Sequence, residues 1–114
     1  MRIDEIEDMF EMSNFNYRTT GLPANIDVWV RTDPAYHGHD RYRIKVTRDR
    51  IWAGIFTVGA NPKLVKDINN SITTSEHNLI TEWIKTYSSL IIGLIDGKID
   101  SAEFAIELQK LRGS

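Results

Sequence analysis

The chain has 114 residues, no cysteine and a formal net charge of −2, with 41% hydrophobic and 26% charged residues. These values predict one globular domain over residues 1–114, and the lack of cysteine excludes disulfides, thiol catalysis and thiolate metal sites. No apolar run approaches the roughly 20 residues that cross a bilayer, and the acidic start does not resemble a signal peptide, so we expect a cytoplasmic protein without a membrane partner or a cofactor.

Charge is distributed unevenly along the chain. Residues 1–12 carry one basic and five acidic side chains, whereas residues 31–50 carry six basic and three acidic ones. The overall balance gives no general attraction to nucleic acid or to acidic lipid. The basic segment is therefore a local feature, and it is the strongest charge signal in the sequence.

The first third of the chain predicts a helix, a loop and a strand. Apolar residues recur at helical spacing over residues 3–12, with acidic residues on the other face. Residues 13–25 are rich in turn formers and show no period, so they predict a loop anchored by Phe15 and Tyr17. Residues 26–32 alternate apolar and polar side chains, as a half-buried strand does.

Two further strands are predicted after the connection at 33–40. In residues 41–47, one alternating set is apolar and the other is cationic, which again indicates a half-buried strand. A tight turn is predicted at Arg48-Asp49. The run "RIWAGIFTV" at 50–58 is typical of a strand covered on both faces, and Gly54 within it indicates a β-bulge or a close approach by a helix.

The remaining residues predict two helices. Residues 63–72 are compatible with a short helix or with an irregular strand. Thr73 and Glu76 have capping-box spacing, and apolar residues continue at helical spacing from about 75 to 95. Together with a final helix, these elements predict an α+β fold in the order α-β-β-β-α-α, with a three-stranded, mainly antiparallel sheet packed against the long helix.

The stretch "DGKIDSAEF" at 96–104 has the spacing of the second half of a calcium-binding EF-hand loop. The first and third ligand positions of such a loop would fall on Ile92 and Leu94, which have no oxygen to offer a cation. A helix–turn–helix joint explains the same residues. Gly97 suits the left-handed position after a helix, while Asp100 and Glu103 form a second capping box.

A metal site is one hypothesis for the loop that holds His37 and His39. Asp40 and the distant His77 could complete a set of nitrogen and oxygen ligands, as zinc prefers. His-x-His alone is weak support, and the alternative is a polar connection turned by Gly38. No nucleophile motif or phosphate-binding loop occurs, so we expect that the protein is not an enzyme.

A cationic patch with aromatic neighbours is the preferred candidate site. The expected contact residues are Trp29, Arg31, Tyr36, His37, His39, Arg41, Arg43, Lys45, Arg48 and Arg50. Arginine, tryptophan and tyrosine dominate the binding energy of many protein interfaces, and the same residues hold phosphates and stack on bases. A solvated sheet face paired with the acidic N-terminal segment is the structural alternative.

Several short motifs carry a family resemblance. With Gly21-Leu22-Pro23, "VWV" at 28–30, "RIKV" at 43–46 and the later "EWI…DGKID…F…L", the chain resembles small accessory proteins of bacteriophages and bacterial mobile elements. The resemblance implies a compact protein that acts by stoichiometric binding, for example as an inhibitor of a host defence complex such as CRISPR–Cas. The expected function is therefore a non-enzymatic protein-binding protein. The alternatives are a small nucleic-acid-binding module and a metal-dependent hydrolase at His37 and His39.

Overall fold

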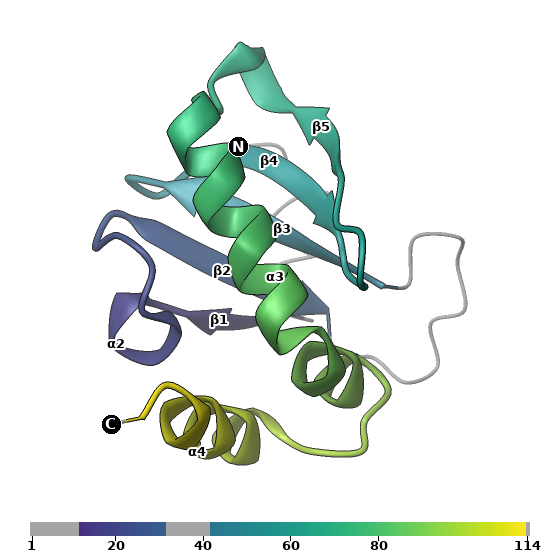
Figure 1. Ribbon diagram of the computed structural model, residues 1–114. Helices are drawn as coiled ribbons and strands as arrows, with labels where there is room; N and C mark the ends of the chain where they lie inside the picture. The colour runs from purple at the N-terminus through teal and green to yellow at the C-terminus, as the bar shows by residue number, and fades with distance from the viewer. Residues whose placement is uncertain (1–11, 32–41, 114) are drawn as a thin grey trace.

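The computed structural model describes residues 12–31 and 42–113. These residues form an α+β fold in which a five-stranded antiparallel sheet, ordered β1-β2-β3-β4-β5, is crossed on one face by the long helix α3 (Figure 1). The elements are β1 (Met12–Phe15), α2 (Tyr17–Thr20), β2 (Ile26–Arg31), β3 (Arg43–Arg48), β4 (Ile51–Thr57), β5 (Leu64–Asp67), η1 (Ile68–Asn70), α3 (Thr74–Ile95) and α4 (Ser101–Leu111). No helix among these residues is both long and apolar enough to span a membrane.

The predicted three-stranded sheet and the order α-β-β-β-α-α are wrong, because strands occur at both edges of the sheet where no clear strand pattern exists. Residues 13–25, predicted as a loop, contain β1 and α2, and β1 pairs antiparallel with β2. Residues 63–72 contain both β5 and the short helix η1. Each edge strand has only four residues, so hydrogen bonding to its neighbour, rather than a periodic pattern, defines it. The predicted helix over 3–12 lies outside the described residues, except that Met12 begins β1.

The alternation predicted for the two central strands is confirmed. Val28 and Val30 of β2 are fully buried, and Val28 pairs with Val46 of β3. These side chains point toward α3, where Ile80 and Ile84 are equally inaccessible. The apolar core therefore lies between the inner face of the sheet and α3.

A β-bulge in β4 changes the direction of Trp52. The register with β3 pairs Val46 with Gly54 and then Thr47 with Trp52, so that Ala53 is the extra residue. Because side chains alternate with a period of two, one inserted residue moves every side chain beyond it to the opposite face. Trp52 therefore lies on the outer face of the sheet, which is the face opposite α3, rather than in the core.

The hairpin between β3 and β4 turns one residue later than predicted. Arg48 pairs with Ile51, which leaves Asp49 and Arg50 as a two-residue loop. Their φ angles of 54° and 67° lie in the left-handed region, as a type I′ turn requires. This turn leaves Arg48 inside the strand, where alternation directs its side chain to the inner face.

The Arg48 side chain joins the sheet to the start of α3. Its Nη1 lies 2.8 Å and 3.0 Å from the two carboxylate oxygens of Glu76 and also donates to the Ser71 carbonyl oxygen at 3.0 Å. Glu76 in turn accepts from the Thr73 backbone N–H, which confirms the predicted capping box. The same carboxylate therefore caps α3 and forms the partly buried ion pair with Arg48. Burial by itself raises the pKa of Glu76, but hydrogen bonds from Thr73 and Arg48 and the charge of Arg48 outweigh burial and lower it below 4.5.

The ion pair predicts a specific loss of stability in acid. Because the pKa of Glu76 is lower in the folded than in the unfolded state, its stabilising contribution is present above 4.5 and is lost as the pH falls through the folded value. We expect Glu76→Gln to cost about 1–2 kcal/mol at neutral pH and progressively less in acid, measured by urea unfolding across the pH range. Glu107→Gln is the control, because Glu107 and Lys110 form an exposed pair. A constant cost of E76Q at every pH would contradict this account.

The C-terminal helix α4 packs beside β1 and α2. Phe104 is fully buried and lies 4.7 Å from Phe15 between ring centroids. Arg112 donates to the carbonyl oxygens of Arg18 and Thr19 at the end of α2. Of the two predicted loop anchors, Phe15 is buried, whereas Tyr17 is 40% exposed.

Candidate binding site on the outer sheet face

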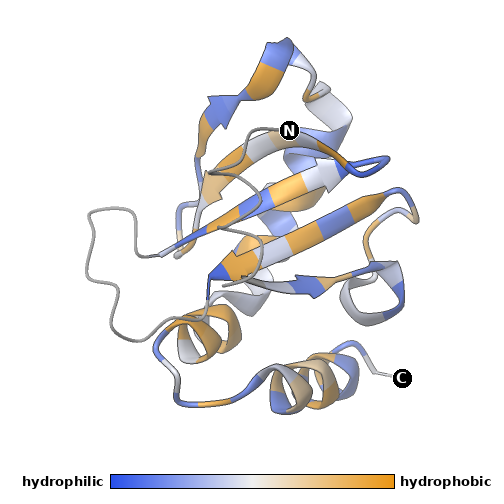
Figure 2. Cartoon of the chain, turned by 180° about the vertical axis from the view of Figure 1, so that it is seen from behind, coloured by the Kyte–Doolittle hydropathy of each residue, from blue (hydrophilic) through white to orange (hydrophobic). Residues whose placement is uncertain are grey.

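The outer face of the sheet carries no helix among the described residues (Figure 2). Two adjacent rows of side chains cross it. The register places Asn14, Trp29, Lys45 and Ile55 in one row, and Asp27, Thr47 and Trp52 in the next. Side chains in neighbouring rows of a sheet are close enough to contact one another when they are long or aromatic. The outer face therefore brings residues from β1 to β4 together.

Trp29 and Trp52 form the centre of this arrangement. Their ring centroids are 5.5 Å apart with an interplanar angle of 58°, and both side chains are half-buried. The Trp29 indole N–H donates to Thr47 Oγ1 at 3.1 Å, and Lys45 Nζ lies 5.6 Å from the Trp52 ring centroid. The Trp52 indole nitrogen is buried and has no hydrogen-bond partner among the residues that the structure describes. A buried donor left unsatisfied costs about 1–3 kcal/mol, so the position of Trp52 is not explained by stability alone.

A pocket of about 500 Å³ lies against the two tryptophans. Its described lining consists of Asn14, Asn16, Asp27, Trp29, Thr47, Arg50 and Trp52. The Asp27 carboxylate makes no hydrogen bond or ion pair with the residues that the structure describes. The pocket thus combines two aromatic rings with a carboxylate, two amides and a guanidinium group, which is the mixture found in sites that orient a polar ligand.

The predicted contact residues are distributed between the two faces of the sheet. Strand alternation places Arg31, Arg43 and Lys45 on the outer face with Trp29. Arg50 lines the pocket from the hairpin turn, whereas Arg48 contacts Glu76 on the inner side.

The remaining predicted contacts, Tyr36, His37, His39 and Arg41, lie outside the described residues, and so does Asp40 of the metal hypothesis. The ring of His77 lies in α3, 6.2 Å from that of Phe56. Residues 12–31 and 42–113 contain no group of three histidine or acidic side chains that could hold a metal ion.

Five of the described pocket residues were not predicted as contacts: Asn14, Asn16, Asp27, Thr47 and Trp52. Trp52 was assigned to a strand covered on both faces, because the inserted residue at Ala53 is invisible to a period-two pattern. Gly54 indicated a β-bulge or a close approach by a helix, and the bulge occurs beside it, but the glycine did not show that Trp52 would change face. Asn14 was assigned to a loop, and its place in the pocket follows from the pairing of β1 with β2.

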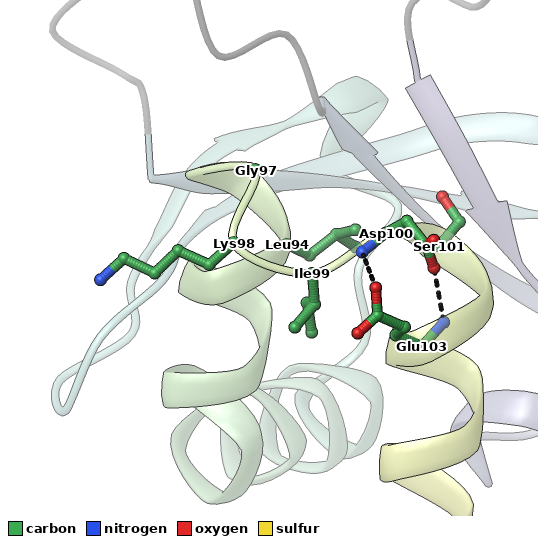
Figure 3. Close-up of a pocket in the computed structure, with 7 residues that line it drawn as sticks. All are labelled: Leu94, Gly97, Lys98, Ile99, Asp100, Ser101 and Glu103. Atoms are coloured by element: carbon green, nitrogen blue, oxygen red, sulfur yellow. Dashed lines mark hydrogen bonds between the residues drawn. The ribbon is translucent and has the colours of Figure 1, made fainter.

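The joint between α3 and α4 borders a second pocket, of about 380 Å³. Lys98 N–H donates to the Gly93 carbonyl and Gly97 N–H to the Leu94 carbonyl, while Gly97 has φ 75°, which together form a Schellman motif. Asp100 and Glu103 each accept from the other's backbone N–H, as the dashed lines in Figure 3 show. Because both carboxylates serve as caps, the interpretation of "DGKIDSAEF" as a helix joint is confirmed, and this pocket is a by-product of the turn.

Comparisons of the chain with protein-family models, with curated proteins and with solved structures give no match.

Proposed function

We propose that the chain is a non-enzymatic binding protein whose partner is another protein and whose contact surface is the outer face of the sheet. The observation that carries the proposal is the bulge at Ala53, which moves Trp52 out of the core and next to Trp29. Folding favours burial of a tryptophan, and the core side of β4 would bury Trp52 more completely than the outer face does. Tryptophan is among the residues most enriched where binding energy is concentrated, especially beside a pocket that excludes water.

The outer face supports a protein partner better than sequence-independent binding along a nucleic-acid strand. Sequence-independent binding of a single strand needs a cationic groove and aromatic rings that offer their faces to successive bases. Here Arg48 is directed to the other side of the sheet and Asp27 interrupts the cationic surface with a negative charge, so the described residues form no continuous cationic groove. The net charge of −2 adds no long-range attraction to phosphates.

The resemblance to phage and mobile-element proteins adds a biological setting to this proposal. The resemblance implies stoichiometric binding, for example to a host defence complex, and a nucleic-acid-targeting complex such as CRISPR–Cas is the partner that we propose. This step rests on association with the family and not on the geometry of the site.

Substitution of the two tryptophans tests the contact surface. The complex recovered from nuclease-treated host lysate would first be identified by mass spectrometry and rebuilt from purified components. We then expect Trp29→Ala and Trp52→Ala each to raise the dissociation constant at least tenfold, which corresponds to about 1.4 kcal/mol. Removal of a hot-spot side chain costs a complex that much binding free energy or more. Calorimetry with the purified partner provides the measurement.

Ile106→Ala is the matched control, since Ile106 is a 54% exposed apolar residue on α4, away from the outer face. Circular dichroism and urea unfolding would establish that each variant is folded. Unchanged affinity of both tryptophan variants would reject the outer face as the contact surface. Binding of unrelated single strands that weakens steeply with salt would instead support the nucleic-acid alternative.

A further inference from the structure

We propose that the pocket beside Trp29 and Trp52 binds an unpaired guanine base. This site goes beyond the protein contact proposed above and does not depend on it. The residues that carry the inference are the two tryptophans, Asp27 and Arg50, which line one pocket of about 500 Å³. That volume lies within the roughly 300–1,000 Å³ typical of small-molecule sites.

The charge of the described pocket lining favours a neutral ligand with polar edges. Among its described lining residues are one carboxylate and one guanidinium group, whose formal charges cancel. A cationic ligand would meet the Arg50 guanidinium, and an anionic ligand would meet the Asp27 carboxylate. A neutral group that carries hydrogen-bond donors on one edge and acceptors on another can satisfy both side chains.

The aromatic lining favours a planar ligand. The rings of Trp29 and Trp52 are inclined to each other by 58°. Stacking of a base on an aromatic side chain is worth about 1–3 kcal/mol, and it requires only one accessible ring face. Recognition of unpaired bases on the open face of a sheet combines such stacking with hydrogen bonds to the base edges.

The unpaired carboxylate selects among the bases. Asp27 is half-buried and has no partner among the described residues, so its two oxygens are available to donors on a ligand. Guanine presents two adjacent donors, N1–H and the N2 amino group, which a carboxylate can accept together. Cytosine and adenine each offer one exocyclic amino group beside an acceptor, and uracil offers one imino group. Guanine also presents O6 and N7, the acceptors that arginine contacts most often in nucleic-acid recognition.

Nucleoside monophosphates provide the test, because the four differ only in the base. We expect calorimetric titration of the full chain to show GMP binding at least tenfold tighter than AMP, CMP or UMP. Asp27→Asn replaces one acceptor oxygen by a donor and should reduce GMP affinity at least tenfold, which abolishes the preference. Asp49→Asn removes the same charge from the hairpin turn, outside the described pocket lining, and should leave GMP binding unchanged.

A short uridine oligonucleotide with one central guanine distinguishes the two sources of the base. Tighter binding of this strand than of GMP would assign the site to single-stranded nucleic acid, and equal or weaker binding would assign it to a free nucleotide. No binding of either probe, equal binding of all four monophosphates, or an unaltered preference in D27N would overturn the proposal. None of these results bears on partner affinity, so failure of the guanine site is distinguishable from failure of the protein contact.

Discussion

Replacement of Phe104 by alanine is expected to destabilise the fold by about 3–5 kcal/mol, the range measured for buried aromatic side chains. Phe104 is fully buried and contacts Phe15, so it joins α4 to β1 at the edge of the sheet. It also occupies the fourth position of α4, where it can pack with Ile99 as a hydrophobic staple. Removal of the ring would leave a cavity that the rigid sheet edge can fill only partly. Urea unfolding followed by tryptophan fluorescence gives the free energy.

Ile106→Ala again provides the matched comparison, because it shortens a side chain on the same helix that is 54% exposed. We expect a change within about 0.5 kcal/mol, since surface substitutions rarely exceed that value. Should F104A also change stability by less than 1 kcal/mol, α4 would contribute little to the folded core. The described packing of Phe104 would then be wrong.

Replacement of Gly54 by valine is expected to cost about 3 kcal/mol, the upper end of the usual range for overpacking. A Cβ atom at this position would lie 3.1 Å from the Lys66 carbonyl oxygen, 3.2 Å from Leu64 Cδ1 and 3.3 Å from Ile72 Cγ1. The two side chains can shift, but the carbonyl belongs to the backbone of β5. Valine adds two further methyl groups to this contact, so β5 must move away from β4.

Alanine at the same position separates this crowding from the general effect of losing a glycine. G54A should destabilise by about 1 kcal/mol, whereas Gly93→Ala in α3 should stabilise by about 0.5–1 kcal/mol, because alanine favours a helix over glycine. A Cβ on Gly93 meets nothing closer than Ile99 Cγ1 at 3.8 Å. Thermal or urea unfolding of G54A and G93A shows whether each substitution stabilises or destabilises the fold. Stabilisation by both substitutions would show that β5 is not closely packed at Gly54.

Only part of the candidate site could be predicted from the sequence. The alternation of β2 and β3 predicted that Trp29, Arg43 and Lys45 share a face, and the register agrees. Arg48 was grouped with them because it is cationic and close in sequence. The alternation of side chains along β3 instead directs it to the inner face, where it contacts Glu76. Proximity along the chain is a poor guide where each successive residue changes face.

Local motifs were predicted well because their contacts are local. The capping boxes at Thr73 and Asp100 and the left-handed Gly97 each involve backbone groups within a few residues, so the chain defines them before any tertiary contact forms. The long helix α3 likewise follows from apolar spacing that recurs over many turns.

The sequence by itself thus determined the central strands, the two C-terminal helices and the joint between them. Tertiary structure alone decided the edge strands β1 and β5 and the side of the sheet on which Trp52 lies. The physical reason is that a helix turn and its caps are stabilised by residues three or four apart, whereas a short strand or a bulge is defined by the strand beside it. The binding pocket was also decided by tertiary structure, because Asp27, Thr47 and Trp52 come together only through the pairing of β2, β3 and β4.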